Sequence, residues 1–173
     1  MNAQENAYLQ LTVPLAQAAQ KKWGVLSSVS EAQSILESSN KLGWGQSELA
    51  RVDNNYFGIK AEHLDQPDTY CEFRTEEFLN GSTQPTTIVA RFERYFEPGE
   101  SFDDHARLLA TAERYAPAMA VRNDPVAFAH QLQLCGYSTS PTYAVAIARL
   151  IKMYDLTQYD IQPDGPAAAQ AAA

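Results

Sequence analysis

Residues 30–62 read SEAQSILESSNKLGWGQSELARVDNNYFGIKAE, and a change of pattern inside this stretch decides the fold class. Its first part places Ala32, Ile35 and Leu36 at helical spacing, which predicts the inner face of a helix that ends near Ser38. Beyond that point glycines and short β-favouring runs replace the helical spacing. The stretch therefore predicts a helix that leads directly into a region of loops and strands.

The chain before this stretch predicts one more helix. Apolar residues recur at helical spacing over residues 5–23, with Pro14 expected to bend or restart the helix and Gly24 to end it. Ser28 or Ser30 is the expected cap of the second helix.

The region after this stretch predicts a small antiparallel sheet. Residues 40–100 contain β-favouring runs such as TTIV and the turn signal Asn80-Gly81. We expect these strands to form a β lobe over about residues 66–97.

Helix signals then return three times. They begin at Ser101, at Asp124 followed by Pro125, and at Ser140 followed by Pro141.

This order of elements predicts an α+β fold, mainly helical, in which a small β lobe forms one side of a cleft. A chain of 173 residues is long enough for one domain, which we expect to span residues 1–160. Residues 161–173 lack a periodic pattern and are expected to form a disordered tail.

Composition restricts the classes of partner. A net charge of −8 disfavours nucleic acid and favours a basic protein partner. No stretch has the length of apolar sequence that crosses a bilayer, and the N-terminus lacks the features of a signal peptide. The two cysteines, Cys71 and Cys135, are either two free thiols or one bridge across the cleft.

Glu37 is the first candidate for chemistry. A carboxylate at the end of a helix, beside apolar residues, has two reasons for a raised pKa, and a raised pKa suits a general acid. An ordinary solvated glutamate is the alternative. A second carboxylate would come from Glu72, Glu76 or Glu77, because glycoside hydrolysis typically uses two carboxylates.

Aromatic residues gather near glycines and turns, where they either stack on sugar rings or pack in the core. They are Trp44, Tyr56, Phe57, Tyr70, Tyr137 and Tyr143. The three histidines, His63, His105 and His130, lack the spacing of metal ligands, and His105 fits the surface of a helix's first turn. We expect no metal and no cofactor.

Four ordered motifs resemble the glucosaminidase family, family 73 of the glycoside hydrolases, over roughly residues 20–155. The family's Ala-Gln-Ala-x-Leu-Glu-Ser-Gly-Trp-Gly pattern is similar to residues 32–38 and 43–45, and its Asn-Asn-x-Phe-Gly-Ile-Lys pattern to residues 54–60. The segments ARFERYFEPGESFDDHARLL and CGYSTSPTYAVAIARLI resemble the two later motifs.

This resemblance implies a lysozyme-like fold and hydrolysis, in bacterial peptidoglycan, of the β-1,4 bond on the reducing side of N-acetylglucosamine. It implies Glu37 as the acid, Glu77 as the β-lobe glutamate, with Glu76 as the alternative, and Tyr137 beside the scissile bond. Substrate binding is expected of Trp44, Asn55, Tyr56, Phe57 and Tyr143. The main departure is an insertion at residues 39–42, which lengthens the loop beside the acid and serves either the groove or recognition.

The resemblance leaves mechanism and role open. Either Glu77 activates water, with inversion, or the substrate's acetamido group attacks, with retention. We expect a monomer that acts as an antibacterial effector of the type VI secretion kind. Such an effector would be secreted or delivered to the periplasm and blocked by a cognate immunity protein. A phage endolysin, an autolysin and a peptidoglycan-binding domain without activity are the alternatives.

Overall fold

A computed structural model describes residues 1–61, 67–77 and 86–162, with the backbone alone at 67, 75–77 and 86. Helices predominate in these ranges, and the strands pair in one two-stranded antiparallel sheet, as the sequence predicted. The helices are α1 (Ala3–Trp23), α2 (Ser27–Ser38), α3 (Glu48–Asp53), α4 (Pro98–Thr111), α5 (Ala116–Ala120), α6 (Pro125–Leu134) and α7 (Tyr143–Met153), and the strands are β1 (Tyr70–Glu77) and β2 (Thr86–Glu93). Three short 3-10 helices are η1 (Pro67–Thr69), η2 (Glu113–Tyr115) and η3 (Leu156–Tyr159).

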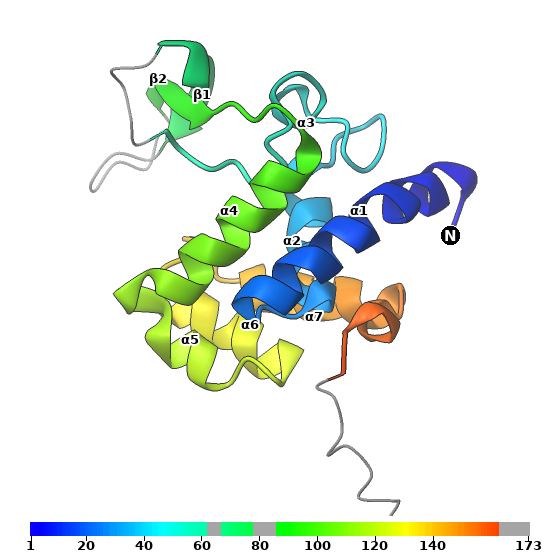
Figure 1. Cartoon of the computed structure of the whole chain (residues 1–173). Coiled ribbons are helices and arrows are strands. Elements are labelled where there is room, and N and C mark those ends of the chain that lie inside the picture. The colour runs from blue at the N-terminus through cyan, green and yellow to red at the C-terminus, as the bar shows by residue number, and fades with distance from the viewer. Residues whose placement is uncertain (62–66, 78–85, 163–173) are drawn as a thin grey trace, which may run out of the picture.

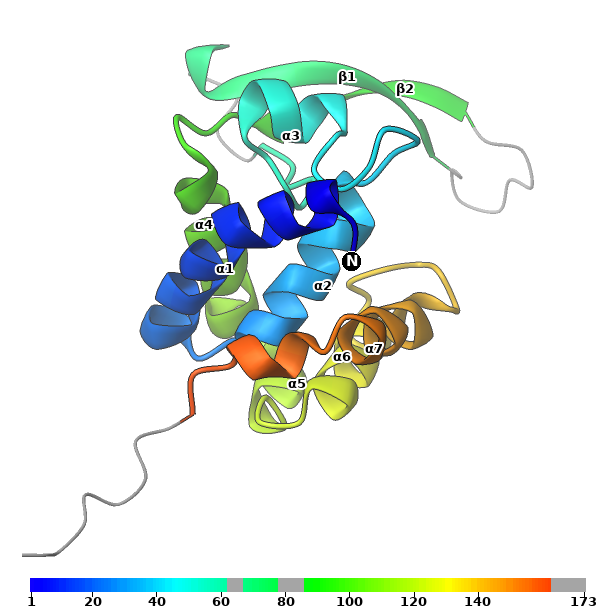
Figure 2. The same ribbon diagram turned by 90° about the vertical axis from the view of Figure 1, so that its right-hand side faces the viewer.

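The helical body and the strand pair lie at opposite ends of the molecule (Figure 1). Helices α1, α4, α6 and α7 surround α2, while α3 lies at the end that carries the strands (Figures 1 and 2). Helix α2 contacts α1, α6, α7 and η3, and ten of its 12 residues are buried. The catalytic candidate Glu37 is therefore carried by the central helix.

Local capping interactions fix both ends of helix α1. Asn2 and Glu5 form a capping box, and Gly24 ends the helix in the left-handed conformation at φ 78°. The predicted end at Gly24 is confirmed. Pro14 lies inside one continuous helix, so the expected restart at this residue is wrong.

Helix α2 is not capped by its own serines, as the sequence had suggested. Ser28 and Ser30 lie inside the helix and are fully buried. Distant segments satisfy its first turn instead: the Ser27 amide donates to Gln20 Oε1 at 3.1 Å, and the Ser28 amide to Asp160 Oδ1 at 2.7 Å. Tertiary partners thus replace the local cap.

The later helices test three predicted starts. Asp124 caps α6, because its Oδ1 accepts from the amides of Val126 and Ala127, and this start is confirmed. Helix α4 begins earlier than predicted, at Pro98, where Glu97 and Glu100 form the capping box. The predicted start at Ser140 is also wrong, since α7 begins at Tyr143.

The strands pair over their full lengths, from Tyr70 opposite Glu93 to Glu77 opposite Thr86. The predicted turn at Asn80-Gly81 lies outside the described residues. The same holds for residues 163–173 of the expected tail, and the stated limits of the β lobe remain a prediction. Helix α3 was not predicted, and Ser47 caps it by accepting a hydrogen bond from the Ala50 amide at 3.2 Å.

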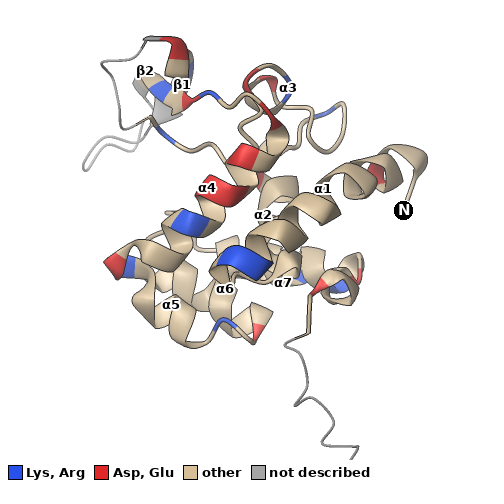
Figure 3. Cartoon of the chain, viewed as in Figure 1, with Lys and Arg blue, Asp and Glu red and all other residues tan. Residues whose placement is uncertain are grey.

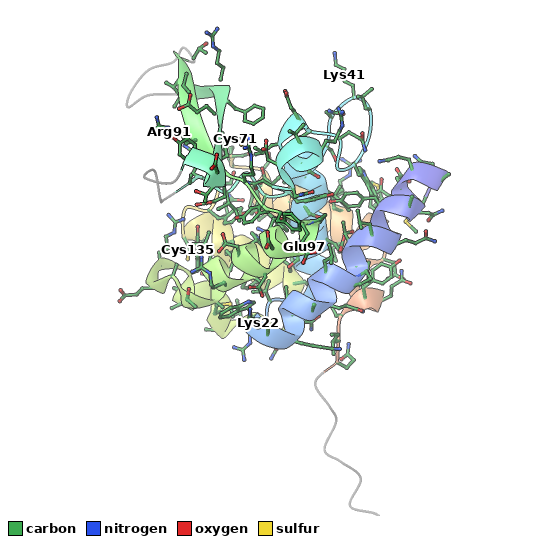
Figure 4. The ribbon with its side chains drawn as sticks, turned by 45° about the horizontal axis from the view of Figure 1, so that its top comes forward. Lys22, Lys41, Cys71, Arg91, Glu97 and Cys135 are labelled. Atoms are coloured by element: carbon green, nitrogen blue, oxygen red, sulfur yellow. The ribbon has the colours of Figure 1, made fainter. Side chains whose placement is uncertain are left out.

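Both cysteines are free thiols, so the bridge left open by the sequence is not formed. Cys71 lies in β1, where its thiol contacts the Phe92 carbonyl at 3.6 Å. Cys135 follows α6 in the helical body, and Figure 4 shows the two labelled residues well apart.

In the ranges that the structure describes, no helix has both the length and the apolar character needed to span a membrane.

Candidate active site

A cavity of about 520 Å³ lies between the helical body and the strand-bearing end. It is bounded by the end of α2, the segment before β1, the end of β2, helix α4, η2 and the loop after α6. Its lining residues are Glu37, Phe57, Gly58, Ile59, Lys60, Glu93, Asp104, His105, Arg107, Leu108, Arg114, Tyr115 and Tyr137. The structure thus brings Glu37, Phe57 and Tyr137, three residues predicted from the sequence, to one cavity.

One wall of the cavity is fixed by Asn55, which is 1% exposed. Its amide nitrogen donates to the carbonyls of Ile59 and Glu93 at 3.0 and 2.9 Å. Its oxygen accepts from the amides of Phe57 and Ile59. Gly58 at φ 64° completes the turn, a conformation that L residues rarely adopt. Asn55 therefore shapes the wall from behind.

Glu37 lies in the last turn of α2, and its side chain opens into the cavity. Protein atoms surround enough of the carboxyl group that loss of hydration raises its pKa from 4.5 to about 6. The side chain is nevertheless open to solvent on the cavity side. This combination leaves a proton on an accessible carboxyl group at mildly acidic pH.

Two tyrosines accompany the acid. Burial raises the pKa of Tyr137 well above its usual value, and the nearby Tyr143 and Glu37 add to this effect. The rings of Tyr137 and Tyr143 lie 5.4 Å apart, and the Tyr143 hydroxyl accepts a bond from Gln33 Nε2 at 2.7 Å. Since Gln33 belongs to α2, the tyrosine pair is tied to the helix that carries the acid. Both phenols are neutral hydrogen-bonding groups.

Three of the residues predicted to bind substrate lie in the core instead of on the cavity wall. Trp44, Tyr56 and Tyr143 are 8%, 7% and 3% exposed. Trp44 packs edge-on against Tyr154 at 4.6 Å, and both Trp44 and Tyr56 contact the ring of Tyr8. The Trp44 and Tyr56 rings thus join α1 to the part of the chain between α2 and β1.

The β-lobe carboxylates are placed only in part. Glu77 is the last residue of β1 and Glu76 precedes it, but their side chains lie outside the described residues. Glu72 is exposed and pairs with Arg91 across the strands at 2.9 Å. The assignment of a second carboxylate to Glu77 remains a prediction.

Charged residues that sequence reasoning missed line the same cavity. Lys60, Arg107 and Arg114 provide cations, and Glu93 and Asp104 provide carboxylates. Acidic positions occupy the first half of α4 with a basic one beyond them (Figure 3). These charged residues follow no regular spacing in the sequence, so the sequence alone did not indicate that they share a site.

Asp104 is already engaged within this set. Its carboxylate accepts from the Tyr95 hydroxyl at 2.7 Å and binds the guanidinium of Arg107. Asp104 therefore holds α4 against the segment that follows β2.

Comparison with known proteins assigns the chain to a family. The model of the glucosaminidase family, described as mannosyl-glycoprotein endo-beta-N-acetylglucosaminidase, matches residues 13–156. The chain belongs to the glucosaminidase family of glycoside hydrolases. The matched residues include Glu37, Tyr137 and the whole cavity lining.

Individual members of the glucosaminidase family agree with this assignment. The exo-glucosaminidase LytG of Bacillus subtilis is 39% identical over 150 residues, which are 84% of this chain and 50% of LytG. The peptidoglycan hydrolase FlgJ of Vibrio parahaemolyticus is 36% identical over 134 residues, which are 76% of this chain and 41% of FlgJ. The chain thus spans about half the length of these curated relatives or less.

A solved structure shows the same fold. The catalytic domain of the autolysin Auto from Listeria monocytogenes superimposes with a TM-score of 0.77 at 29% identity, covering 92% of this chain and 89% of that domain. The lysozyme-like α+β fold of the glucosaminidase family is thereby confirmed.

The position of His105, which borders the cavity, was predicted wrongly from the sequence. It is fully buried beneath the cavity, not on a helix surface, and its ring stacks on Phe57 at 3.9 Å with an angle of 7°. Burial lowers the pKa of its imidazole to about 3, so the ring is neutral. Within the described ranges no group of three His, Cys, Asp or Glu residues is arranged to hold a metal ion.

Proposed function

We propose that this chain hydrolyses the β-1,4 glycosidic bonds of bacterial peptidoglycan, with Glu37 as the general acid. The observation that carries the proposal is the accessible carboxyl group of Glu37 in the cavity that it shares with Tyr137. Burial raises the pKa of this group to about 6. Relatives named peptidoglycan hydrolase and autolysin support the substrate class.

The acid delivers its proton to the oxygen that links two sugars while the carbon–oxygen bond breaks. Positive charge then develops at the anomeric carbon, and water finally supplies the hydroxyl group of the new reducing end. The glutamate needs the proton at the start, and burial favours that state. Tyr137 lies in the same cavity as a neutral phenol that is able to donate a hydrogen bond.

Two routes remain for the far side of the sugar. In one, Glu77 activates a water molecule and the product is inverted; in the other, the acetamido group attacks, Tyr137 steadies it, and the product is retained. Proton NMR of the first product separates these routes by its anomeric configuration. Replacement of Glu77 by Gln is expected to lower turnover as strongly as loss of the acid only in the inverting route.

We further propose that the cut lies on the reducing side of N-acetylglucosamine, within the strand. The description of the matching family, endo-beta-N-acetylglucosaminidase, supports this choice, while LytG is named exo-glucosaminidase and other relatives are named probable N-acetylmuramidase. Purified sacculi are digested, the products are reduced with borohydride, and mass spectrometry identifies the reduced sugar. Reduced N-acetylglucosamine is the expected result, and reduced N-acetylmuramic acid would contradict it.

Among the residues expected to bind substrate, Phe57 has the most direct support because it lines the cavity. Its ring is only 5% exposed and stacks on His105, so we propose that it supports the wall of the sugar site. Asn55 contributes by fixing the turn that carries Phe57, and Tyr143 by supporting Tyr137. Trp44 and Tyr56 support the same region from the core.

The place of action follows from the proposed substrate, which lies outside the cytoplasmic membrane. The antibacterial effector role, the cognate immunity protein and the monomeric state remain predictions from the sequence. Expression with and without a periplasmic signal tests the place of action. Lysis only upon export is expected, and equal toxicity in both compartments would contradict it.

A further inference from the structure

The interface between α1 and α2 contains a fully buried carboxyl group, Glu31, which the proposed chemistry does not use. Glu31 lies on α2, the helix that also carries Glu37. Its Oε2 lies 2.8 Å from the hydroxyl oxygen of Thr12, which is itself fully buried on α1. Its Oε1 has no hydrogen-bond partner in the part of the chain that the structure describes.

The number of available protons decides the state of this carboxyl group. The Thr12 hydroxyl has one hydrogen, yet its oxygen is within bonding distance of two acceptors, Glu31 Oε2 and the carbonyl oxygen of Tyr8 at 3.0 Å. If Glu31 carries a proton on Oε2, it donates to Thr12, and Thr12 donates to Tyr8. Both contacts are then full hydrogen bonds. An ionised Glu31 would leave one of them without a hydrogen.

The surroundings favour the same neutral state. No Lys, Arg or His forms an ion pair with Glu31 in the described ranges, and burial raises its pKa to about 8. An unpartnered carbonyl oxygen in the acid form costs much less than an unpartnered charged oxygen.

In the described ranges, no charged group on the elements packed against α2 acts on Glu31. Tyr8 faces it from α1, and its buried phenol is neutral because burial and Glu31 both raise its pKa. Tyr143 of α7 binds Gln33, and Asp160, which follows η3, binds Ser28. His130 of α6 is exposed.

The same interface continues to the turn that holds the catalytic acid. The Tyr8 hydroxyl donates to Ser34 Oγ at 2.9 Å and lies 3.5 Å from Ser38 Oγ. Ser38 directly follows Glu37 and is 1% exposed. Thr12 and Tyr8 therefore hold α1 to α2 from Glu31 to the end of the helix.

We propose that Glu31 is a positioning residue whose neutral carboxyl group donates a hydrogen bond to Thr12 and thereby fixes α2, with Glu37 at its end, against α1. The part that concerns catalysis rests on the proposed function. Ionisation of Glu31 places an uncompensated charge in this interface, so the support of Glu37 weakens as the pH rises. Below the titration of Glu31 the interface is intact.

The first test measures the proton directly and needs no variant. NMR of the wild-type chain with 13C-labelled glutamate follows the Glu31 carboxyl carbon from pH 4 to pH 10. A midpoint close to 8 is expected. A midpoint near 4.5, the value of a solvated glutamate, would overturn the proposal.

The second test follows melting temperature against pH for wild type, Glu31→Gln and Glu48→Gln. Gln is neutral at every pH and keeps a donor for Thr12, while Glu48 is exposed on α3 and serves as the matched control. Relative to Glu31→Gln, the wild-type Tm is expected to fall by about 10 °C between pH 5 and pH 9. Parallel curves for wild type and Glu31→Gln would overturn the proposal.

The third test separates positioning from stability. Peptidoglycan hydrolysis is measured below the melting transitions of both proteins, and the kcat of Glu31→Gln is divided by that of wild type at each pH. The titration of Glu37 cancels in this ratio. A ratio near one at pH 6 that rises at least threefold at pH 9, with KM unchanged, supports positioning. A constant ratio would overturn it. A wild-type chain without hydrolase activity would instead contradict the proposed function, because titration and melting are read without substrate.

Discussion

Replacement of Glu37 by Gln is the most direct examination of the proposed chemistry. Gln keeps the size and hydrogen-bonding reach of the side chain but has no proton to deliver to the leaving oxygen. General acid catalysis typically contributes ~10²–10⁴-fold, so muropeptide release is expected to fall by at least 100-fold. Folding is expected to persist, because the carboxyl group is open to the cavity on one side.

The raised pKa of Glu37 also predicts how the proposed acid responds to pH. With a pKa of about 6, roughly one tenth of Glu37 is protonated at pH 7. At its ordinary value of 4.5, the protonated fraction would be about 30-fold smaller. In the proposed mechanism the protonated form is the active one, so kcat/KM is expected to be highest on the acidic side and to fall as the pH rises through about 6.

The assay is release of soluble muropeptides from purified sacculi between pH 4 and pH 9, resolved by chromatography. The Glu48→Gln variant, altered at an exposed glutamate on α3, is the control and should match wild type. If Glu37→Gln releases products at the wild-type rate with an unchanged melting temperature, the wrong acid has been named. A wild-type alkaline limb below pH 5 would refute the desolvation argument instead.

Three further predictions concern the fold that carries the site. Asn55→Ala removes four hydrogen bonds from a buried turn and is expected to lower the free energy of unfolding by roughly 2–4 kcal/mol, read from urea denaturation. Asp124→Ala should cost about 1 kcal/mol in the same assay, because α6 loses its cap. Because Cys71 and Cys135 are free, denatured protein kept without reductant should show two titratable thiols, and none would indicate a bridge.

Local chemistry explains which parts of the fold could be predicted. Gly24 and Asp124 act on residues beside them, so their effects on α1 and α6 are visible in the sequence. Helix α2 lacks such a signal because its first amides bind Gln20 and Asp160. Asp160 is far away in sequence, and no local rule connects it with Ser28.

The candidate site divides in the same way. The raised pKa of Glu37 could be predicted, since the end of a helix beside apolar residues is a local feature, but its role as the acid remains a prediction from the family resemblance. His105 could not, because its neighbours in sequence, Asp103 and Asp104, suggest a solvated surface. Its burial depends on Phe57, which arrives from a separate segment and stacks on the imidazole ring.

The same reasoning explains why aromatic residues gave a mixed result. Trp44, Phe57 and Tyr137 all lie near glycines, and the sequence offers no distinction between a ring that faces a cavity and one that faces the core. Trp44 is covered by Tyr8 and Tyr154, which belong to opposite ends of the chain. Packing of α1 and of the segment after α7 against the middle of the chain decides which rings are covered and which border the cavity.

Glu31 and Glu37 show how one helix sets two different proton affinities. Both carboxyl groups lie on α2 and both lose hydration, but Glu37 keeps an opening to the cavity while Glu31 has none. Burial raises the pKa of Glu37 to about 6 and that of the more deeply buried Glu31 to about 8. The proposed acid, Glu37, thus titrates near pH 6. The group that must keep its proton, to bind Thr12, titrates above it.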